Sequence, residues 1–386
     1  MYEMGRAELA AVRKVIESGQ TFRYRGGEGG WCDQFEAGLS KRIGVKHAVT
    51  TSSGTAALVC GLVGLGVGPG DEVIIPAYTF MASAIAPLAA GAIPVIAEVD
   101  ETLSLDPKDL ERKITPYTRV IMPVYMLGRP CNMDAILAIA RKHNLLVCED
   151  ACQAMGGAYH GRPLGSLGHI GTFSFNHFKI IACGEGGALV TDDLRVYDRA
   201  LIHHDGGCVF RKHADKLSHP FFTGSNYRAS EFQGAILCAQ LGRLDGILKR
   251  LRARREVMSR VLAKAKAFRL TPDNDAEGDC GTTLGLLFDT VTEAQAFVES
   301  QKSTGLEMFR PIDSGRHVYS NWEPILSRQG SHHPSLNPYN WAKREITYSK
   351  DMCPATLDIL SRTVCISVPY KLSLAQARSV AKKMVS

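Results

Sequence analysis

The stretch Leu145-Leu-Val-Cys-Glu-Asp-Ala-Cys-Gln153 decides the fold class. Its apolar residues predict a buried strand, and the carboxylates of Glu149 and Asp150 follow directly at the end of that strand. A carboxylate at the carboxyl end of a buried strand is where an α/β fold places ligand-binding groups. The sequence therefore predicts an α/β fold with a functional site at the sheet edge where Asp150 stands.

The same pattern continues on both sides of this stretch, from about residue 46 to residue 193. Almost unbroken apolar runs predict strands, and helical segments such as residues 133–143 separate them. The predicted strands are residues 47–51, 72–76, 93–97, 119–124, 145–148, 169–175 and 188–191. Apolar strands that alternate with helices are typical of a largely parallel sheet that is buried on both faces.

A second, smaller domain is expected, because 386 residues exceed the size of one ordinary core. A helix predicted at residues 230–251 leads into it. The pattern then predicts strands at 283–289 and 362–369, helices at 293–301 and 375–384, and a largely loop segment at 305–350. We expect a large domain over residues 1–246, with an N-terminal helix and loop, and a small α/β domain over residues 247–386.

The composition is that of a soluble globular protein, with 45% hydrophobic and 22% charged residues. The net charge of +6 is modest, and the densest basic stretch, residues 249–255, is interpreted as the solvated face of a helix. No aromatic platform or nucleic-acid-binding motif accompanies it. The N-terminus lacks a signal-peptide pattern, and no apolar run reaches membrane-spanning length. We expect a cytoplasmic protein that binds neither nucleic acid nor membrane.

The 11 cysteines are scattered and odd in number. Several of them, such as Cys60, Cys148 and Cys238, lie inside apolar runs, where a free thiol packs as a small hydrophobe. No CxxC pair is present, and adjacent side chains such as those of residues 203–205 (His-His-Asp) point apart on a regular element. The sequence therefore predicts free thiols and no metal site.

Lys179 is the most informative single residue. It lies among apolar neighbours in Ser174-Phe-Asn-His-Phe-Lys-Ile-Ile-Ala-Cys-Gly-Glu-Gly-Gly187, just before a glycine-rich turn. Burial would lower the pKa of this amine and free its lone pair to attack an aldehyde. A lysine for a Schiff base and a carboxylate such as Asp150 for a pyridinium nitrogen are the groups that a pyridoxal phosphate site needs most. Singly, each residue also has an ordinary interpretation, as a snorkelling lysine and a helix-capping aspartate.

Two further motifs follow predicted strands. Thr51-Ser-Ser-Gly-Thr-Ala-Ala57 joins a strand to a helix, and exposed amides at a helix N-terminus form a phosphate site. Pro76-Ala-Tyr-Thr-Phe80 brings aromatic rings that could stack on a planar cofactor. Ordinary helix capping and core packing are the alternative interpretations of these two motifs.

The motifs together resemble those of a known family. In order along the chain they are Ser53-Gly-Thr-Ala-Ala57, Glu149-Asp-Ala-Cys-Gln-Ala154, Phe173-Ser-Phe-Asn-His-Phe-Lys179 and Gly184-Glu-Gly-Gly187. This series resembles the DegT/DnrJ/EryC1/StrS family of pyridoxal phosphate-dependent sugar and cyclitol aminotransferases, from residue 22 to the C-terminal helix. The resemblance implies the aspartate aminotransferase fold, type I, with a mostly parallel seven-stranded sheet in the large domain.

The resemblance also implies a role for each matching residue in a cofactor site. Lys179 would form the internal aldimine and move the substrate proton. Asp150 would pair with the pyridine nitrogen, Gln153 would bond the cofactor's 3-oxygen, and Phe80 would stack on the ring. The phosphate would lie among Gly54, Thr55, Ala56 and Ser174.

A homodimer with shared active sites is implied as well. Gly224-Ser-Asn-Tyr-Arg228 is similar to the family's Gly-x-Asn-x-Arg, whose Asn reaches the phosphate of the neighbouring subunit, which gives Asn226 that role. The implied reaction has two stages: L-glutamate or L-glutamine converts the cofactor to pyridoxamine 5'-phosphate, which then aminates an acceptor. The implied acceptor is a keto-sugar, nucleotide-linked or free, or a keto-cyclitol.

The resemblance also implies candidates for substrate contacts, which lie in loops. They are Arg23 and Tyr24 in the N-terminal loop, Glu185 in the glycine-rich turn, and His317 and Tyr319 in the segment 311–319. Arg23 could hold a carboxylate of the donor or acceptor by a bidentate pair. Solvated or structural roles are the alternatives for these residues.

Three other functions are alternatives to transamination. A sugar dehydratase of the same family would carry His in place of Lys179. A non-catalytic regulator would have no reason to keep Lys179, Asp150 and Gln153 together. A nicotinamide-dependent oxidoreductase would need Gly-x-Gly-x-x-Gly after the first strand, where this chain has Ser52-Ser-Gly-Thr-Ala-Ala57.

Overall fold

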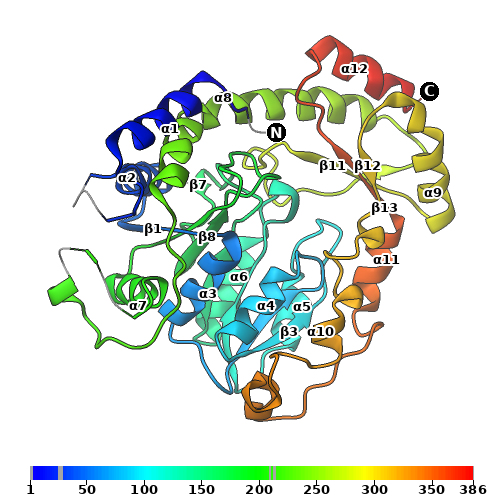
Figure 1. The fold of residues 1–386 in the computed structure, drawn as a ribbon. Helices are drawn as coiled ribbons and strands as arrows, with labels where there is room; N and C mark the ends of the chain where they lie inside the picture. Colours follow the sequence, from blue (N-terminus) through cyan, green and yellow to red (C-terminus); the bar gives the residue numbers. More distant parts are fainter. Residues whose placement is uncertain (1–2, 25–28, 208–209, 212–213, 386) are drawn as a thin grey trace.

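The computed structural model describes residues 3–24, 29–207, 210–211 and 214–385. A seven-stranded sheet and a four-stranded sheet organise this part of the chain, and the long helix α8 runs past both of them (Figure 1). A short hairpin of β6 (Ala158–Tyr159) and β7 (Arg162–Pro163) adds a separate two-stranded sheet.

The seven-stranded sheet has the strand order β1-β9-β8-β5-β4-β2-β3. Its strands are β1 (His47–Thr51), β2 (Glu72–Pro76), β3 (Ile93–Ala97), β4 (Thr118–Ile121), β5 (Leu146–Asp150), β8 (Ile170–Ser174) and β9 (Gly187–Thr191). Strand β9 runs antiparallel to its neighbours β1 and β8, and the other pairs are parallel. The mostly parallel sheet predicted from the apolar runs is confirmed.

Both faces of this sheet are covered, which explains why its strands are apolar at successive positions. Val73 and Ile75 of β2 pack in one core cluster, and Ile74 between them packs in the other. The first cluster includes α3 (Gly54–Gly64), α4 (Ala82–Ala89) and α7 (Leu194–His204). The second includes α2 (Trp31–Ile43), α5 (Pro107–Arg112), α6 (Met133–Lys142) and part of α8. Each strand therefore buries side chains on both sides.

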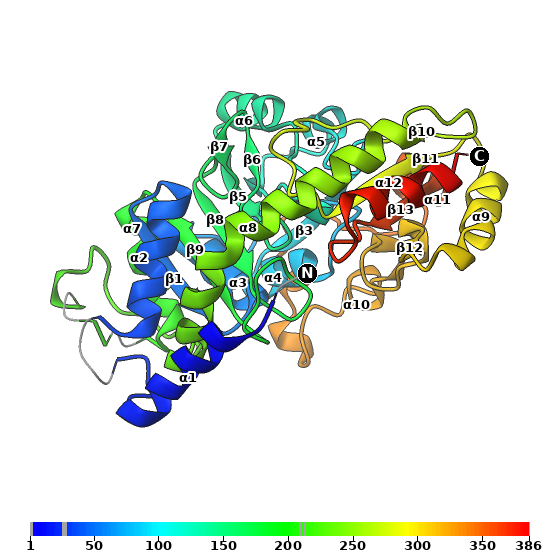
Figure 2. The same ribbon diagram turned by 90° about the horizontal axis from the view of Figure 1, so that it is seen from above.

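Helix α8 (Glu231–Leu262) continues beyond residue 251, where the sequence pattern ended it, so that residue 247 lies inside the helix. Its N-terminal part packs on α1 (Arg6–Ser18) and α2, and its C-terminal part packs on α12 (Leu374–Lys383) (Figure 2). The interpretation of residues 249–255 as a solvated face is wrong in part. Arg252 and Arg254 donate to the backbone oxygens of Asp279 and Leu372 at 2.7 and 2.6 Å, so these cations tie the helix to the C-terminal part.

The four-stranded sheet is antiparallel, with the order β10-β11-β13-β12. Its strands are β10 (Arg269–Leu270), β11 (Thr283–Leu287), β12 (Met308–Phe309) and β13 (Thr363–Ser367), and α9 (Val291–Ser300), α11 (Pro354–Arg362) and α12 accompany them. The segment 305–350 is less of a loop than expected. It holds β12, α10 (Glu323–Leu326) and the 3-10 turns η4 (Pro311–Asp313), η5 (Tyr319–Asn321), η6 (Pro334–Leu336) and η7 (Pro338–Trp341).

Among the described residues, no helix combines the length and the apolar character needed to cross a membrane. The same residues contain no group of three or more His, Cys, Asp or Glu side chains that could hold a metal ion. Three further 3-10 turns are η1 (Met126–Gly128), η2 (Ala214–Lys216) and η3 (Lys302–Thr304).

Candidate active site

The predicted site residues gather at one edge of the seven-stranded sheet. The parallel strands β2 and β5 end at that edge with Pro76 and Asp150, and β8 ends there with Ser174. Strand β9 begins there, because it is antiparallel to β8 and pairs Gly187 with Ser174. The loops that follow these strand ends therefore share one region of the molecule.

The N-terminus of α3 forms one part of the site. Ser53 caps the helix, and its hydroxyl accepts a hydrogen bond from the N–H of Ala56 at 3.1 Å. A Cβ built on Gly54 would lie 2.6 Å from the Cβ of Ser174 and 3.1 Å from the Sγ of Cys152. The structure thus brings Gly54 and Thr55, in the first turn of α3, together with Ser174 at the end of β8. The free amides of a first helical turn bind anions.

Asp150 is buried at the end of β5, with 4% of its surface exposed. Its Oδ2 accepts a hydrogen bond from the hydroxyl of Ser83 at 2.7 Å, and its Oδ1 accepts one from the N–H of Cys152 at 3.1 Å. The hydroxyl of Thr79 lies 2.7 Å from that of Ser83. The sequence analysis missed Ser83 and Thr79. The available signal was a pair of hydroxyl residues, four apart, that flank Phe80 in an otherwise apolar segment.

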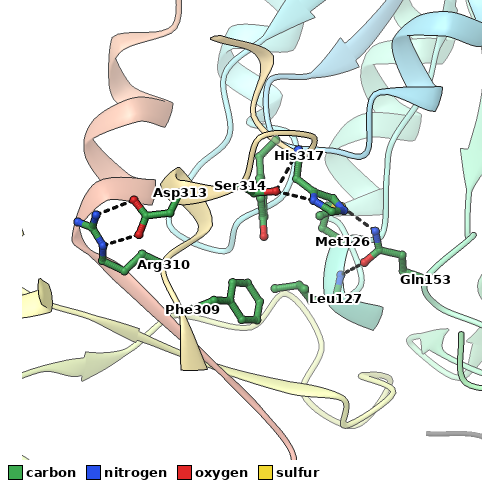
Figure 3. Close-up of a pocket in the computed structure, with 9 residues that line it drawn as sticks. Met126, Leu127, Gln153, Phe309, Arg310, Asp313, Ser314 and His317 are labelled. Atoms are coloured by element: carbon green, nitrogen blue, oxygen red, sulfur yellow. Dashed lines mark hydrogen bonds and ion pairs between the residues drawn. The ribbon is translucent and has the colours of Figure 1, made fainter. Parts of the chain in front are cut away.

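Gln153 follows Asp150 in the same loop. Its Oε1 accepts a hydrogen bond from the N–H of Leu127 at 3.0 Å, and its Nε2 lies 3.3 Å from the Sδ of Met126 (Figure 3). Both contacts come from the turn that contains η1, after β4. The side chain is therefore held by a neighbouring loop and not by solvent.

Lys179 is half-buried and acts electrostatically on two residues of the site. Burial raises the pKa of the Cys152 thiol well above its usual value, and Lys179 opposes that increase in part. Burial also lowers the pKa of His317 to about 4, with further lowering from the charges of Lys179 and Arg316. Lys179 therefore lies in the same region as Cys152, next to Asp150, and as His317.

A cavity of about 300 Å³ opens beside these residues (Figure 3). Its lining residues are Tyr78, Met126, Leu127, Gln153, Phe309, Arg310, Asp313, Ser314 and His317. Arg310 pairs with Asp313 through two contacts of 2.6 and 2.9 Å, and the hydroxyl of Ser314 lies 2.7 Å from Nδ1 of His317. The cavity thus has mainly apolar walls with a few polar groups, which is typical of a small-molecule site.

His317 reaches the cavity because residues 317–319 pair in the antiparallel direction with residues 77–79, which follow β2. The N–H of Thr79 donates to the oxygen of His317 at 2.9 Å, and the N–H of Tyr319 donates to the oxygen of Ala77 at 3.0 Å. Phe80, which is 40% exposed, lies in the same place, with its ring centre 5.5 Å from that of His317. The structure therefore brings His317 and Phe80 together, as the sequence analysis expected of residues in one site.

The structure does not bring Tyr319, Arg23 and Tyr24 into this cavity. The buried Tyr319 donates its hydroxyl hydrogen to the oxygen of Lys350 at 2.8 Å and accepts the N–H of Cys353 at 2.9 Å. Arg23 is 2% exposed, and its guanidinium forms ion pairs of 2.8 Å with Glu36 and with Asp33. The hydroxyl of Tyr24 donates to the carboxylate of Asp205 at 3.1 Å. In this chain all three side chains are occupied by structural contacts.

Glu185 and Asn226 are exposed. The backbone oxygen of Glu185 accepts a hydrogen bond from Nε2 of Gln233 at 2.6 Å. The side-chain oxygen of Asn226 accepts a hydrogen bond from the N–H of Arg228 at 3.3 Å. Asn226 also lies near the turn that leads into α3, because the N–H of Ser52 in that turn donates to the backbone oxygen of Tyr227 at 2.7 Å. Both residues lie at the surface around the N-terminus of α3.

This arrangement fits pyridoxal phosphate. It combines a half-buried lysine, a buried carboxylate fixed by two donors, and a helix N-terminus at which Gly54 lets Ser174 approach closely. The fold is that of the fold-type-I pyridoxal phosphate-dependent enzymes. The chain belongs to the DegT/DnrJ/EryC1/StrS aminotransferase family, whose model matches residues 3–313. The family predicted from the motifs is confirmed.

Two curated relatives illustrate the similarity. The chain is 46% identical over 215 residues to GDP-perosamine synthase of Caulobacter vibrioides, an alignment that covers 55% of this chain and 56% of that relative. It is 35% identical over 316 residues to L-glutamine:2-deoxy-scyllo-inosose aminotransferase of Streptoalloteichus tenebrarius, which covers 75% of this chain and 73% of that one. The matched region spans 56% to 65% of the length of the first relatives.

Solved structures agree with the fold over the whole chain. The structure of 3-amino-5-hydroxybenzoic acid synthase superposes with a TM-score of 0.81 at 29% identity, covering 100% of this chain and 97% of that one. The Escherichia coli GDP-4-keto-6-deoxy-D-mannose-3-dehydratase, solved with bound hydrated pyridoxal phosphate, has a TM-score of 0.80 at 20% identity, covering 100% and 98%. The second similarity concerns the fold alone.

Proposed function

We propose that this protein is a pyridoxal phosphate-dependent aminotransferase that moves an amino group from L-glutamate or L-glutamine to a keto-sugar or keto-cyclitol. The observation that carries the proposal is the position of Lys179. It lies in one region with the Asp150–Cys152 loop and with His317 at the wall of the cavity. An amine between a cofactor-binding carboxylate and a substrate cavity is where amino-group transfer requires it.

The cofactor would supply an electron sink for the charge that develops on the substrate carbon. The residues of the chain would hold and orient it. Asp150 would face the ring nitrogen, and its carboxylate cannot turn away because Ser83 and the N–H of Cys152 hold both oxygens. The first turn of α3 and the hydroxyl of Ser174 would bind the phosphate. Phe80 would cover the ring.

Lys179 would bind the cofactor between turnovers and carry the proton at the substrate carbon. His317, with a pKa of about 4, is neutral at physiological pH and leaves the lysine as the basic group of this part of the site. The apolar side chains of Tyr78, Leu127 and Phe309 would exclude water from the reacting atoms.

The substrate classes follow from the relatives and from the cavity. The two curated relatives are named for a sugar amine and for the amination of a cyclitol with L-glutamine. The Arg310–Asp313 pair gives the cavity a guanidinium that an acidic group of a substrate could bind in place of Asp313. A nucleotide-linked keto-sugar would supply such an acidic group through its phosphates, whereas a free keto-sugar or a keto-cyclitol would bind with the Arg310–Asp313 pair intact.

The proposal extends to the assembly. The exposed Asn226 is available to the phosphate site of a second copy, so we propose a homodimer with shared sites. We also propose that residues 1–246 form the cofactor-binding domain and residues 247–386 the smaller one, each with its own sheet. A cytoplasmic location is proposed because the cysteines described in the structure are free thiols.

The test is the visible absorption spectrum of the purified protein. With pyridoxal phosphate, a yellow band that is absent in Lys179→Ala supports the proposed site, and its bleaching by L-glutamate or L-glutamine identifies the donor. The bleached protein is then given keto-sugars and keto-cyclitols, and the acceptor is the one that restores the colour. A protein that cannot take up the cofactor contradicts the proposal. A band that persists with every amino donor favours the dehydratase reaction or an unusual donor instead.

A further inference from the structure

The turn between β4 and α6 has an unusual backbone. Leu127 has a φ of +59° and Gly128 a φ of +76°. A left-handed conformation is unfavourable for a residue with a side chain, so the surrounding contacts must hold Leu127 in place. The same residue lines the cavity and donates its N–H to Oε1 of Gln153 at 3.0 Å (Figure 3).

This N–H determines how the amide of Gln153 is oriented. A backbone N–H can only donate, so the side-chain oxygen of Gln153 must face Leu127. One hydrogen of the NH2 group is then donated to Sδ of Met126 at 3.3 Å, and the other is left as a donor beside the cavity that Gln153 lines. If the turn were displaced, the amide could rotate and present its oxygen instead. An acceptor atom of a ligand would then meet no donor.

The turn is held by the segment that leads into β11 of the small sheet. The hydroxyl of Thr282 donates to the oxygen of Leu127, and the N–H of Cys280 donates to the oxygen of Gly128 at 3.0 Å. The approach is close, because a Cβ on Gly128 would lie 2.8 Å from the Cβ of Cys280. Two successive carbonyl groups of the turn are therefore bound by residues 280–282.

A buried charge cluster fixes both partners of this contact. Arg129, directly after the turn, donates to the hydroxyl of Thr271 and to the oxygen of Pro272, each at 2.6 Å, and pairs with Asp273 at 2.8 Å. Asp279, directly before Cys280, has 1% of its side chain exposed. One of its carboxylate oxygens accepts the N–H of Gly281 at 2.6 Å.

The other oxygen of Asp279 lies 3.3 Å from Nη2 of Arg255 on α8 and 4.0 Å from Nε of Arg129. Arg255 also pairs with Asp273 at 2.7 Å. The cluster thus joins α8, the Leu127 turn and the segment 271–282 in one buried network. Because Arg129 and Asp279 have only 5% and 1% of their side chains exposed, removal of either charge leaves its buried partners without compensation.

We propose that Arg129, Asp279 and Thr282 are positioning residues for Gln153: they hold the left-handed Leu127 turn, which fixes the Gln153 amide with its NH2 group toward the ligand. The identity of that ligand, the 3-oxygen of pyridoxal phosphate, rests on the function proposed above. The position of the small sheet is thereby coupled to a hydrogen bond in the cofactor site.

The first test needs no cofactor. Exchange of the Leu127 amide hydrogen is measured by NMR in the cofactor-free protein, for wild type, Thr282→Val and Asp279→Asn. Each substitution is expected to accelerate this exchange about five- to tenfold, because Thr282→Val removes a hydrogen bond to the turn and Asp279→Asn removes the charge that faces Arg129, directly after the turn. The matched control is Thr363→Val, which also removes a bond from a buried hydroxyl to a backbone oxygen, that of Ile359 at 2.7 Å, but at the far end of β13. Exchange at the wild-type rate in Thr282→Val overturns the proposal.

The second test uses the loaded protein and separates this proposal from the proposed function. The pH midpoint of the yellow band is measured for wild type, Gln153→Leu, Thr282→Val and Thr363→Val. Gln153→Leu should shift the midpoint, Thr282→Val should shift it less but in the same direction, and Thr363→Val should leave it unchanged. A shift in Gln153→Leu without one in Thr282→Val overturns the positioning role alone. Failure of the wild type to form the band overturns the proposed function, while the exchange of the Leu127 amide still decides whether the turn is held as described.

Discussion

Gly54 and Ser174 lie so close together that a Cβ on Gly54 would be 2.6 Å from the Cβ of Ser174. One residue opens α3 and the other ends β8, so this contact joins two loops that are 120 residues apart in the chain. A side chain at residue 54 would force these loops apart, since the obstructing atoms are a Cβ and a nearby Sγ and not the tip of a flexible chain. The turn that we propose to bind the cofactor phosphate therefore depends on a glycine at this position.

Gly54→Ala should weaken binding of pyridoxal phosphate by at least about tenfold, because the amides of the first helical turn are displaced. The dissociation constant is measured by fluorescence titration of the cofactor-free protein. Gly242→Ala is the matched control, because Gly242 lies in α8 with no heavy atom within 4 Å of an added Cβ. Equal affinities for the two variants would contradict the prediction.

Ser83→Ala should reduce the rate of the donor half-reaction by about tenfold, because Asp150 loses a charge-assisted hydrogen bond of about 1.5 kcal/mol. Asp150→Asn should lower the rate far more, since it removes the charge that faces the ring nitrogen. Rapid-mixing spectroscopy of the bleaching step gives both rates. Ser361→Ala, which removes an exposed bond to the oxygen of Asp358, should leave the rate unchanged.

Lys179→Ala should raise the pKa of His317 above its value of about 4 in the cofactor-free protein. The increase should be partial, because burial is the larger cause and remains in the variant. The ring protons of His317 are followed by NMR as a function of pH, with His317→Gln to assign them. Identical titration curves with and without Lys179 would show that the two side chains do not interact.

Asp279 should make the protein less stable as the pH rises. Burial raises the pKa of this carboxyl group to about 6, against the opposing effect of Arg255 and Arg129. The folded state therefore holds the proton more tightly than the unfolded state, and the resulting stabilisation is complete below the unfolded pKa of about 3.9 and is lost as the pH rises through about 6. The full effect is about 3 kcal/mol.

This pH dependence is measured as the difference in unfolding midpoint between wild type and Asp279→Asn from pH 4 to pH 7, in steps. Wild type should lose stability relative to the variant over this interval. A constant difference would mean that the arginines keep Asp279 ionised throughout.

Mixing inactive variants should reveal whether Asn226 acts across subunits. In a heterodimer of Lys179→Ala and Asn226→Ala, a shared site predicts that one active site carries both changes and the other carries neither. Activity should then reappear on mixing, up to about a quarter of that of the wild type in a 1:1 mixture, because about half of the dimers are heterodimers and each has one intact site of two. If Asn226 serves its own subunit, each site of the heterodimer keeps one defect and mixing restores nothing.

The sequence predicted the position of those site residues that directly follow a buried strand. Asp150, Gln153 and Lys179 follow buried strands, and parallel strands bring their carboxyl ends to one edge, so that their proximity could be predicted without coordinates. The alternating apolar runs predicted the large sheet for the same reason. His317 was expected in the site from the resemblance alone, and its place depends on a backbone pairing with Thr79 that no local pattern encodes.

Other parts of the site lay outside what the pattern could show. Ser83 lies in a helix whose composition indicates core, and the contact of Leu127 with Gln153 uses a backbone N–H that every residue possesses. Arg23 was expected to face a substrate because its N-terminal loop corresponds to one that approaches the site in members of the family. Its carboxylate partner Glu36 is 13 residues away and becomes apparent only once the chain has folded.

Helix α8 connects the parts of the molecule that hold the two sheets, and it is one continuous helix of 32 residues, about 48 Å long. One end packs on α1 and α2, and the other holds Asp279 and α12 through its arginines and apolar residues. A joint at residue 247 would cut α8 in its middle. An exchange of the C-terminal part between two relatives should therefore not be made at this residue. The exchanged module would have to carry the second half of the helix with it, so that recombination among such enzymes should preserve α8 as one inherited unit.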